Sequence, residues 1–444
     1  MISLLKTWLL GFLKAGISLS IIKICKDMSV LEKVSSKEAI ALEDQYGAHN
    51  YHPLPVVLER GEGVFVWDVE GKKYYDFLSA YSALNQGHCH PRIVGAMTEQ
   101  ARKLTLTSRA FHNDILGQYE KYATSYFGFD KLLPMNTGAE AVETAIKLAR
   151  KWAYEKKGVK ETEAKIVVCE NNFHGRTTTI ISFSNDEEAR RNFGPYTPGF
   201  IKIPYNDPDA LEKVLDENQD IAGFLVEPIQ GEAGVYVPAE GFLSRTRELC
   251  KKHGVLFIAD EVQTGIGRTG KLLAVDHEEV KPDILILGKA ISGGVYPVSA
   301  VLADNEVMDV IKPGQHGSTF GGNPIACAVA MAALDVIRDE DLAGNAEKLG
   351  NLFRRLMDDY IRNSGIVKLV RGKGLLNAIV INDTEESSTA WDICLRLKDN
   401  GLLAKPTHGN IIRFAPPLVM NQQQLEACVE IITGTLSEFE SQAG

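Results

Sequence analysis

Short apolar runs alternate with amphipathic segments from about residue 75 to residue 325 of this 444-residue chain. Runs without a polar alternate position are typical of strands that are buried on both faces. Because helical patterns separate them, they predict an α/β fold built on a mostly parallel sheet. The expected strands are Leu132–Met135, Ile166–Cys169, Gly223–Val226, Val255–Ala259, Ile284–Leu287 and Val298–Leu302.

The helix expected after Gly138 has the clearest pattern in the chain. Its apolar residues recur at helical spacing and form one stripe, with charged residues on the opposite side. Thr137 suits the position that caps such a helix, and Gly138 would let an anion approach the free N–H groups of the first turn. Met135–Glu140 is therefore a candidate phosphate site, although an ordinary helix cap explains the same residues. The stripe comprises Val142, Ala145, Ile146, Ala149, Trp152 and Ala153.

A second α+β unit is expected beyond Pro324, where a long helix begins at Ile325 and continues to about Asp339. The later patterns predict a helix over 341–363, strands near 367–370 and 375–381, a helix over 388–399, a strand over 411–414 and a final helix. We expect four parts: an extension over 1–27, the first part of a small domain over 28–75, a large domain over 76–325, and the rest of the small domain over 326–444.

The composition excludes some classes of partner. The chain is 45% hydrophobic and 24% charged, which is ordinary for a globular protein of more than one domain. A formal net charge of −10 argues against a nucleic-acid partner or an anionic membrane surface. Seven scattered cysteines without a C-x-x-C pair argue against structural zinc and a disulfide framework, so we expect no metal and a reducing compartment.

Residues 1–27 differ from the rest of the chain. They carry four lysines, and their uncharged runs Thr7–Leu13 and Ala15–Ile22 are shorter than the roughly 18 apolar residues of a membrane-spanning helix. Lys14 interrupts the apolar centre that a signal peptide needs, and the arginine typical of a transit peptide is absent. Three interpretations stay open: an extension outside the native protein, a mitochondrial presequence, and a membrane-surface anchor. Met28 resembles an ordinary start, so we expect a cytoplasmic protein, with the mitochondrial matrix as the alternative.

The strongest chemical signal is a lysine at the end of one apolar run and an acid at the end of another. Lys289 follows Leu285–Gly288, and Asp260 follows Val255–Ala259. A buried ammonium is costly unless it is used, although a lone lysine can also cap a strand at the surface. A pyridoxal-phosphate (PLP) site needs a lysine that forms a Schiff base and an acid that keeps the pyridine nitrogen protonated. The pair therefore predicts a PLP enzyme.

Four other motifs have competing interpretations. Gly265–Gly270 matches the dinucleotide fingerprint G-x-G-x-x-G, but no helical pattern opens inside it, so we treat the match as accidental. Gly87–Pro91 has histidines without a distant partner and is expected to be a loop. Gly317–Pro324 could line a phosphate or an interface. In Asn171–Arg176, the phenylalanine could stack on a cofactor ring and the arginine could clamp a carboxylate, or the segment could be a surface turn.

From about Ser35 onward, almost the whole chain resembles the class III, or ω-aminotransferase, branch of PLP enzymes. The segments that carry the resemblance, together with the motifs above, are Gly47–Pro55, Val226–Glu232 and Gly401–His408. The resemblance implies PLP fold type I, with a large, mostly parallel sheet domain and a smaller α+β domain. It also implies a homodimer with active sites at the interface.

The resemblance assigns roles to the cofactor-binding residues. Lys289 would be the Schiff-base lysine and proton shuttle, Asp260 would pair with the pyridine nitrogen, and Gln263 would lie at the phenolic oxygen. Phe173 would stack on the ring. The residues that would hold the phosphate are Thr137, Gly138, Ala139 and Thr319 of the partner subunit.

The resemblance also implies the substrates, ornithine and 2-oxoglutarate, with acetylornithine or 4-aminobutyrate as alternative amino donors. Tyr51 and Arg176 would hold the α-carboxylate of ornithine. Glu232 would mask Arg413 while ornithine is bound and release it when a diacid enters. Two other classes, an inactive PLP-fold protein and a dinucleotide oxidoreductase, are disfavoured, because every expected catalytic group is present and the glycine motif opens no helix.

Overall fold

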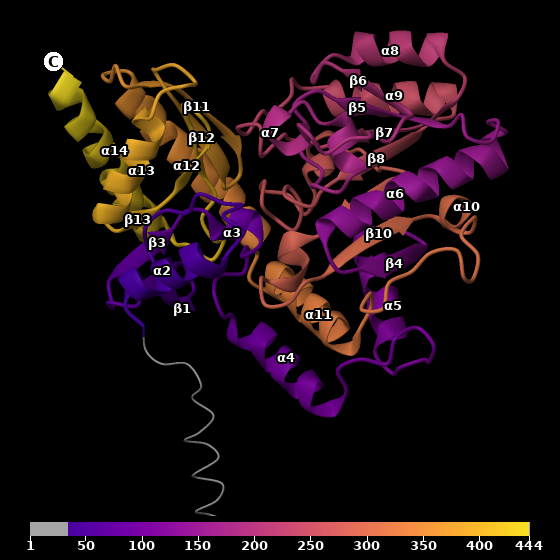
Figure 1. Cartoon of the computed structure of the whole chain (residues 1–444), viewed down its shortest axis with the longest axis horizontal. Coiled ribbons are helices and arrows are strands. Elements are labelled where there is room, and N and C mark those ends of the chain that lie inside the picture. The colour runs from indigo at the N-terminus through magenta and orange to yellow at the C-terminus, as the bar shows by residue number, and fades with distance from the viewer. Residues whose placement is uncertain (1–33, 444) are drawn as a thin grey trace, which may run out of the picture. The chain divides into compact units, whose positions relative to one another are not determined.

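The computed structural model describes residues 34–443 of the chain (Figure 1). The chain divides into two compact units. The smaller unit comprises Met1–Glu59 and Trp67–Lys72, and the larger unit comprises Arg60–Val66 and Lys73–Gly444. The predictions for residues 1–27 lie outside the described residues.

The smaller unit contains helix α2 (Ser36–Tyr46). The helix begins at a capping box in which the side chains of Ser35 and Glu38 each accept from the other's backbone N–H group. The boundaries between the units fall within β1 (Leu58–Glu62) and β2 (Phe65–Asp68).

The larger unit contains a seven-stranded sheet with the order β4-β10-β9-β8-β7-β5-β6. Four neighbouring pairs are parallel, and the predicted α/β fold with a mostly parallel sheet is confirmed. β10 is the exception, because it runs antiparallel to both β4 and β9. The strands are β4 (Lys131–Met135), β5 (Lys165–Cys169), β6 (Phe200–Ile203), β7 (Ile221–Val226), β8 (Leu256–Asp260), β9 (Ile284–Leu287) and β10 (Ser299–Ala303).

Helix α6 (Gly138–Trp152) packs on this sheet along its predicted stripe. Val142 and Ala149 are fully buried and join a core with strand residues such as Ile258 and Val301. Helices α8 and α9 pack side by side, and α9 contacts β8 (Figure 1). The other helices before residue 340 are α3 (Ser79–Ser82), α4 (Pro91–Lys103), α5 (Leu116–Phe127), α7 (Glu187–Arg190), α8 (Pro208–Glu217), α9 (Phe242–His253), α10 (Asn305–Met308) and α11 (Pro324–Asp339). Short π or 3-10 turns are η1 (Ala153–Lys157), η2 (Ile180–Phe183), η3 (Ala274–Glu278) and η4 (Lys289–Ser292).

The C-terminal part of the larger unit has its own antiparallel sheet, with the order β11-β12-β15-β14. β12 is buried along its whole length. Nearby, β13 (Leu402–Leu403) pairs in parallel with β3 (Lys73–Asp76). The remaining elements are α12 (Leu342–Ile361), β11 (Val367–Lys373), β12 (Leu376–Ile381), α13 (Thr389–Asp399), β14 (Lys405–His408), β15 (Ile411–Phe414) and α14 (Gln422–Ala443).

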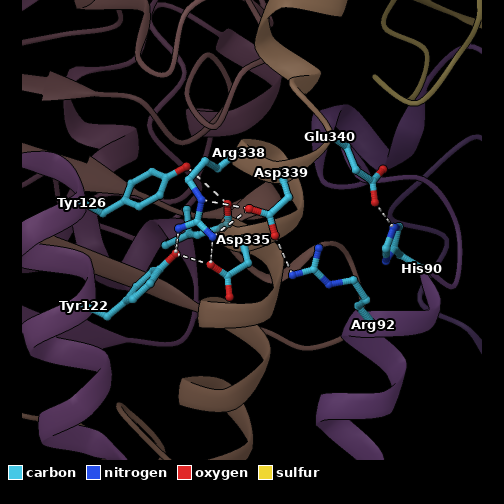
Figure 2. Close-up of polar contacts among 9 residues, drawn as sticks. His90, Arg92, Tyr122, Tyr126, Asp335, Arg338, Asp339 and Glu340 are labelled. Carbon is cyan, nitrogen blue, oxygen red and sulfur yellow. Dashed lines mark hydrogen bonds and ion pairs between the residues drawn. The ribbon is translucent and has the colours of Figure 1, made fainter.

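A polar network joins three helices at the C-terminal end of α11 (Figure 2). Arg338 donates to Asp335 at 2.6 Å and to Asp339 at 2.8 Å. Tyr122 of α5 donates to Asp335 at 2.8 Å, and Arg92 of α4 donates to Asp339 at 2.9 Å. These contacts hold α4 and α5 against the C-terminal end of α11.

No helix opens inside Gly265–Gly270, in agreement with the interpretation of its glycine pattern as accidental. Arg268 is fully buried there and donates to the side chain of Asn85 and to the backbone oxygens of Leu375 and Pro416. Through Arg268, the segment between β8 and β9 that contains this motif is therefore bonded to the C-terminal part of the same unit. Gly87–His90 is a loop, as predicted, and Pro91 begins α4.

Candidate active site

Two of the predicted residues meet at one edge of the large sheet. β8 ends at Asp260 and β9 ends at Leu287, and the two strands are parallel neighbours, so their carboxyl ends lie together. Lys289 follows β9 directly and has a left-handed backbone, with a φ of 45°. A non-glycine residue in that conformation is uncommon and marks a turn that the surrounding structure enforces.

Lys289 and Asp260 line a cavity with a volume of about 190 Å³. A second cleft of about 610 Å³ shares Phe173 and Glu232 with it and also contains Arg176. Phe173 and Glu232 therefore lie where the two spaces meet. The other residues that line the first cavity are Gly138, Ala139, His174, Gly175, Glu227, Ile229, Val262, Gln263 and Thr264.

The amine of Lys289 is prepared for chemistry near neutral pH. Burial lowers the pKa of Lys289 to about 8, and the charge of Arg413 acts in the same direction. The carboxylates of Glu232 and Asp260 partly oppose this shift. A neutral amine can accept a proton or form a covalent bond to a carbonyl carbon, whereas an ammonium can do neither.

Asp260 is held from two sides. Its Oδ1 accepts from the backbone N–H of Val262 at 3.0 Å, and Nδ1 of His174 lies 2.7 Å from its Oδ2. Burial opposes protonation of His174, but the hydrogen bond to Asp260 and the charges of Asp260 and Glu227 outweigh it, so the pKa of His174 is raised. For Glu227, in contrast, burial is itself the cause of the shift and raises the pKa to about 7.

No role was predicted for His174 or Glu227 from the sequence. Glu227 directly follows the apolar strand β7, and Asp260 is the last residue of the neighbouring strand β8. An acid at the end of each of two neighbouring apolar strands is the signal that could have identified it. The backbone N–H of Phe173 donates to Glu227 at 2.8 Å, which ties the strand ends to the loop that carries His174.

The first turn of α6 lies beside the cavity. Thr137 and Glu140 form a capping box, which satisfies the N–H of Glu140 and leaves the preceding amides of Gly138 and Ala139 at the positive end of the helix. A Cβ atom on Gly138 would lie 2.9 Å from Val262, so a side chain there would displace the wall of the cavity.

Glu232, which lines the cavity, forms an ion pair with Arg413. Nη1 of Arg413 donates to Oε2 of Glu232 at 2.9 Å and to the backbone oxygen of Gly231 at 3.1 Å. The side chain of Arg413 is 3% exposed and that of Glu232 is 30% exposed. Burial would raise the pKa of Glu232, but the charge and hydrogen bond of Arg413 outweigh it and lower that pKa.

Tyr81 is a further neighbour of this pair that was not predicted. Its ring centre lies 5.3 Å from the guanidinium carbon of Arg413. It belongs to Ser79–Ser82, where four consecutive non-glycine residues have φ values between 46° and 70°. Left-handed turns of L-residues cost roughly 1–2 kcal/mol per residue, so this conformation is held by its surroundings.

Five predicted residues do not line the first cavity: Thr137, Arg413, Tyr51, Arg176 and Thr319. Thr137 caps α6 beside the cavity, and Arg413 pairs with Glu232, which does line it. The other three are exposed. Tyr51 belongs to the smaller unit and is 69% exposed. Arg176 has a side chain that is 61% exposed, and it lies 3.9 Å from Asp186 and 5.8 Å from the ring centre of Phe173. Thr319 is exposed on the loop before α11. Their predicted roles stay untested.

The fold and the lysine–aspartate arrangement define a class of protein, the fold-type-I PLP enzymes. Within it, the chain belongs to the aminotransferase class III family, because the model of that family matches residues 46–436. The family and the fold type predicted from the sequence are confirmed. Class III aminotransferases depend on PLP, which also confirms the predicted cofactor.

The chain is similar to several named members of the family. It is 62% identical over 401 residues to "Ornithine aminotransferase, mitochondrial" of Drosophila melanogaster, covering 90% of this chain and 92% of the relative. A solved ornithine aminotransferase from Toxoplasma gondii is 48% identical, with a TM-score of 0.91 over 95% of this chain and 99% of that one. A solved acetylornithine aminotransferase from Elizabethkingia anophelis is 68% identical, with a TM-score of 0.85 over 91% of this chain and 100% of that one.

The residues of the cavity fit PLP. A helix N-terminus for a phosphate, a buried carboxylate and a buried amine lie around one space. In addition, Oε1 of Gln263 is buried without a hydrogen-bond partner among residues 34–443, as expected of a group that contacts a ligand.

Proposed function

We propose that the chain transfers the δ-amine of L-ornithine to 2-oxoglutarate and so forms L-glutamate 5-semialdehyde and L-glutamate. The observation that carries this proposal is the ion pair between Arg413 and Glu232, which lines the same cavity as Lys289. Ornithine brings one carboxylate and one α-ammonium, whereas 2-oxoglutarate and glutamate bring two carboxylates. An arginine that is masked for the first substrate and exposed for the others lets one cavity accept both.

PLP, when bound, acts as an electron sink for the carbon that loses a proton. Lys289 would hold it covalently, Asp260 would bind its ring nitrogen, and Gln263 would bind near its phenolic oxygen. Phe173 would pack on its ring. The residues that would bind its phosphate are Thr137, Gly138, Ala139 and Thr319 of the partner subunit.

The chain's own acid–base chemistry follows from burial. Because its pKa is about 8, a sizeable fraction of Lys289 is neutral at physiological pH and can take a proton from the substrate carbon. Asp260 would pair with the protonated ring nitrogen. His174 Nδ1, 2.7 Å from Oδ2 of Asp260, holds the carboxylate in position for this contact.

Tyr51 and Arg176 would bind the α-carboxylate of ornithine. We call Glu232 and Arg413 the gate. When a diacid enters, Glu232 would turn away and the guanidinium would bind the second carboxylate. Part of the cost of breaking the pair is offset, because the Glu232 side chain is 30% exposed and can be solvated once it leaves Arg413.

N-acetylornithine is the alternative donor that a specific observation favours, because the 68%-identical neighbour is named an acetylornithine aminotransferase. This donor carries a neutral amide in place of the α-ammonium, so it gains nothing from the masking carboxylate of Glu232. A panel with 2-oxoglutarate and ornithine, N-acetylornithine, 4-aminobutyrate or lysine decides between the donors. We expect the highest kcat/KM with ornithine; a higher value with N-acetylornithine would replace this proposal.

We also propose that the chain divides into four parts, 1–27, 28–75, 76–325 and 326–444. We further propose that it forms a homodimer in which residues of both subunits contribute to each active site. The exposure of Thr319, Phe320 and Phe111 in the single chain supports an interface there. Mixing the Lys289→Ala and Thr319→Ala variants tests it. Hybrid dimers contain one site with both native residues, so activity should return; a mixture as inactive as its parents contradicts it.

For the location, the mitochondrial alternative has more support than the cytoplasmic expectation, because the Drosophila melanogaster relative is named mitochondrial. Among residues 34–443 the structure has no helix with the length and apolar character needed to cross a membrane. Imaging the full chain and a variant that lacks residues 1–27 in the native cell tests the proposal. Mitochondrial targeting should depend on those residues, while the purified truncated protein should stay active.

A further inference from the structure

Glu232 lies in a closed loop between two bridged residues. Gln230 and Tyr236 form an antiparallel bridge, with N–H to O=C distances of 3.1 Å and 3.0 Å. Inside the loop, the N–H of Val235 donates to the oxygen of Gly231 at 3.2 Å. The position of the Glu232 carboxylate therefore depends on the geometry of this loop.

The loop holds a strained backbone. Val235 has a φ of 58°, a left-handed conformation that is a rare exception for a β-branched residue. Its side chain is 0% exposed and packs in a small core with Ile229 and Ile411. Strain of this kind persists only where surrounding contacts hold it, so the contacts of the loop decide whether it keeps its shape.

Arg371 of β11 provides such a contact. Its Nε donates to the backbone oxygen of Gly234 at 2.8 Å, and its guanidinium carbon lies 3.8 Å from the ring centre of Tyr236. The loop is thus held on both sides of Val235. Thr407 of β14 also donates to the backbone oxygen of Glu232. Because β11, β14 and the β15 strand of Arg413 belong to one sheet, both halves of the gate are positioned by the same frame.

We propose that Arg371 is a positioning residue for donor specificity: it holds the Gln230–Tyr236 loop so that the Glu232 carboxylate masks Arg413. The inference rests on the gate of the proposed function and extends it to a residue that touches neither substrate nor cofactor. With the loop backbone held, the gate opens by rotation of the Glu232 side chain. Without Arg371 the loop relaxes, the mask weakens, and diacid substrates gain at the expense of ornithine.

The test compares the half-reactions of glutamate and ornithine in the PLP-loaded enzyme. In Arg371→Ala the glutamate-to-ornithine ratio of kcat/KM should rise roughly threefold to tenfold, in the direction expected for Glu232→Ala. Arg371→Lys keeps a cation but cannot donate and stack as a planar group. Its glutamate-to-ornithine ratio should therefore lie between those of the native enzyme and Arg371→Ala. In a Glu232→Ala background, Arg371→Ala should leave the ratio unchanged, because residues that act through one group are not additive.

Arg354→Ala is the matched control. Arg354 also donates to a backbone oxygen in this part of the unit, that of Gly374 at 3.0 Å, but it makes no hydrogen bond to the loop. It should lower the melting temperature to a similar extent and leave the ratio unchanged. Hydrogen exchange at the amides of Gln230, Val235 and Tyr236 should quicken in Arg371→Ala and not in Arg354→Ala, with or without cofactor.

The outcomes separate the two proposals. If the native enzyme does not use ornithine, the proposed function fails, and the same cycle is run with its best donor. If it uses ornithine and Arg371→Ala leaves the ratio and the loop exchange unchanged, the positioning role is wrong. A full additional change in the Glu232→Ala background, or an equal change in Arg354→Ala, also overturns it.

Discussion

The cofactor end of the cavity and the gate are built in different ways. Glu227, Asp260 and Lys289 lie at the ends of three neighbouring parallel strands of one sheet, so one local rule of the fold brings them together. Glu232 and Arg413 are 181 residues apart and join a loop to a strand of a different sheet. The first arrangement is fixed by the large sheet, and the second depends on packing between separate parts of the unit.

The cofactor end and the gate also differ in what sets the pKa values of their ionisable groups. At the cofactor end burial dominates, since it lowers the pKa of Lys289 to about 8 and raises that of Glu227 to about 7. At the gate the partner dominates, since Arg413 lowers the pKa of Glu232 in spite of burial. Proton transfer needs groups that are close to changing charge, whereas a mask needs a charged pair that a competing carboxylate can separate.

Lys289→Ala should have the largest effect, and it breaks the cofactor end alone. The variant loses both the covalent anchor and the proton acceptor, so turnover should fall by several orders of magnitude. Steady-state transamination by the purified variant measures this. The ion pair of Glu232 and Arg413 should survive, so the variant should still bind both ornithine and a diacid. Near-normal turnover would show that another amine does the chemistry.

Asp260→Asn should have the next largest effect. The amide cannot keep a proton on the ring nitrogen, so the chemical step should slow about a hundredfold or more, as when one preorganised electrostatic group is lost. Bound PLP and the fold should persist, which absorbance of the cofactor and the melting temperature report. Single-turnover rates equal to those of the native enzyme would mean that a different group binds the ring nitrogen.

Glu232→Ala breaks the gate and leaves the cofactor end intact. With Arg413 unmasked, a diacid no longer has to displace a carboxylate, and the ornithine α-ammonium meets an open guanidinium. The glutamate-to-ornithine ratio of kcat/KM should rise roughly tenfold, about 1.4 kcal/mol. Stopped-flow absorbance follows each half-reaction. Glu188→Ala, which removes another carboxylate of the neighbouring cleft, is the control. Equal losses for both donors would give Glu232 a structural role only.

The contrast explains what could be predicted from sequence. Each of the six strands predicted in the large sheet was located to within two residues, because continuous apolar runs are a strong local signal. β6 was missed, since it is an edge strand of four residues with Lys202 exposed and no long apolar run. The reversal of β10 was also missed, because apolarity carries no strand direction.

The site follows the same division. Lys289 and Asp260 were predicted from the residues alone, since each ends an apolar run, and the structure brings both to one cavity. Glu232 and Arg413 were paired only through the family resemblance, because nothing local in either segment refers to the other. Tyr81 and Arg371 were not found at all. Their importance lies in contacts across separate elements and in strained backbone, which a hydropathy pattern does not contain.

The pH dependence of the stability of the cofactor-free protein is the smallest expected effect. It reports on the cofactor end in an alkaline window and on the gate in an acidic one. The pKa of Lys289 is about 8 in the folded chain and about 10.4 in an unfolded one. Folded protein therefore binds fewer protons in that window, and stability should rise as pH increases from 8 to 10.4. The pKa of Glu232 is also lowered, so its contribution is present above the unfolded value of about 4.3 and is lost as pH falls below it.

Melting temperatures of the native protein, Lys289→Met and Glu232→Gln should be compared from pH 4 to pH 10. Lys289→Met carries no buried ammonium, so its advantage over the native protein should be largest below pH 8 and shrink by a few degrees towards pH 10. Glu232→Gln should lose stability relative to the native protein at neutral pH, and the difference should begin to shrink only as the pH falls below about 4.3 towards the lowered pKa of the folded carboxylate. Because the charge of Glu232 opposes the shift of Lys289, Glu232→Gln should also steepen the rise in stability between pH 8 and pH 10. An alkaline window identical to that of the native protein would mean that the charge at the gate does not reach the amine of Lys289.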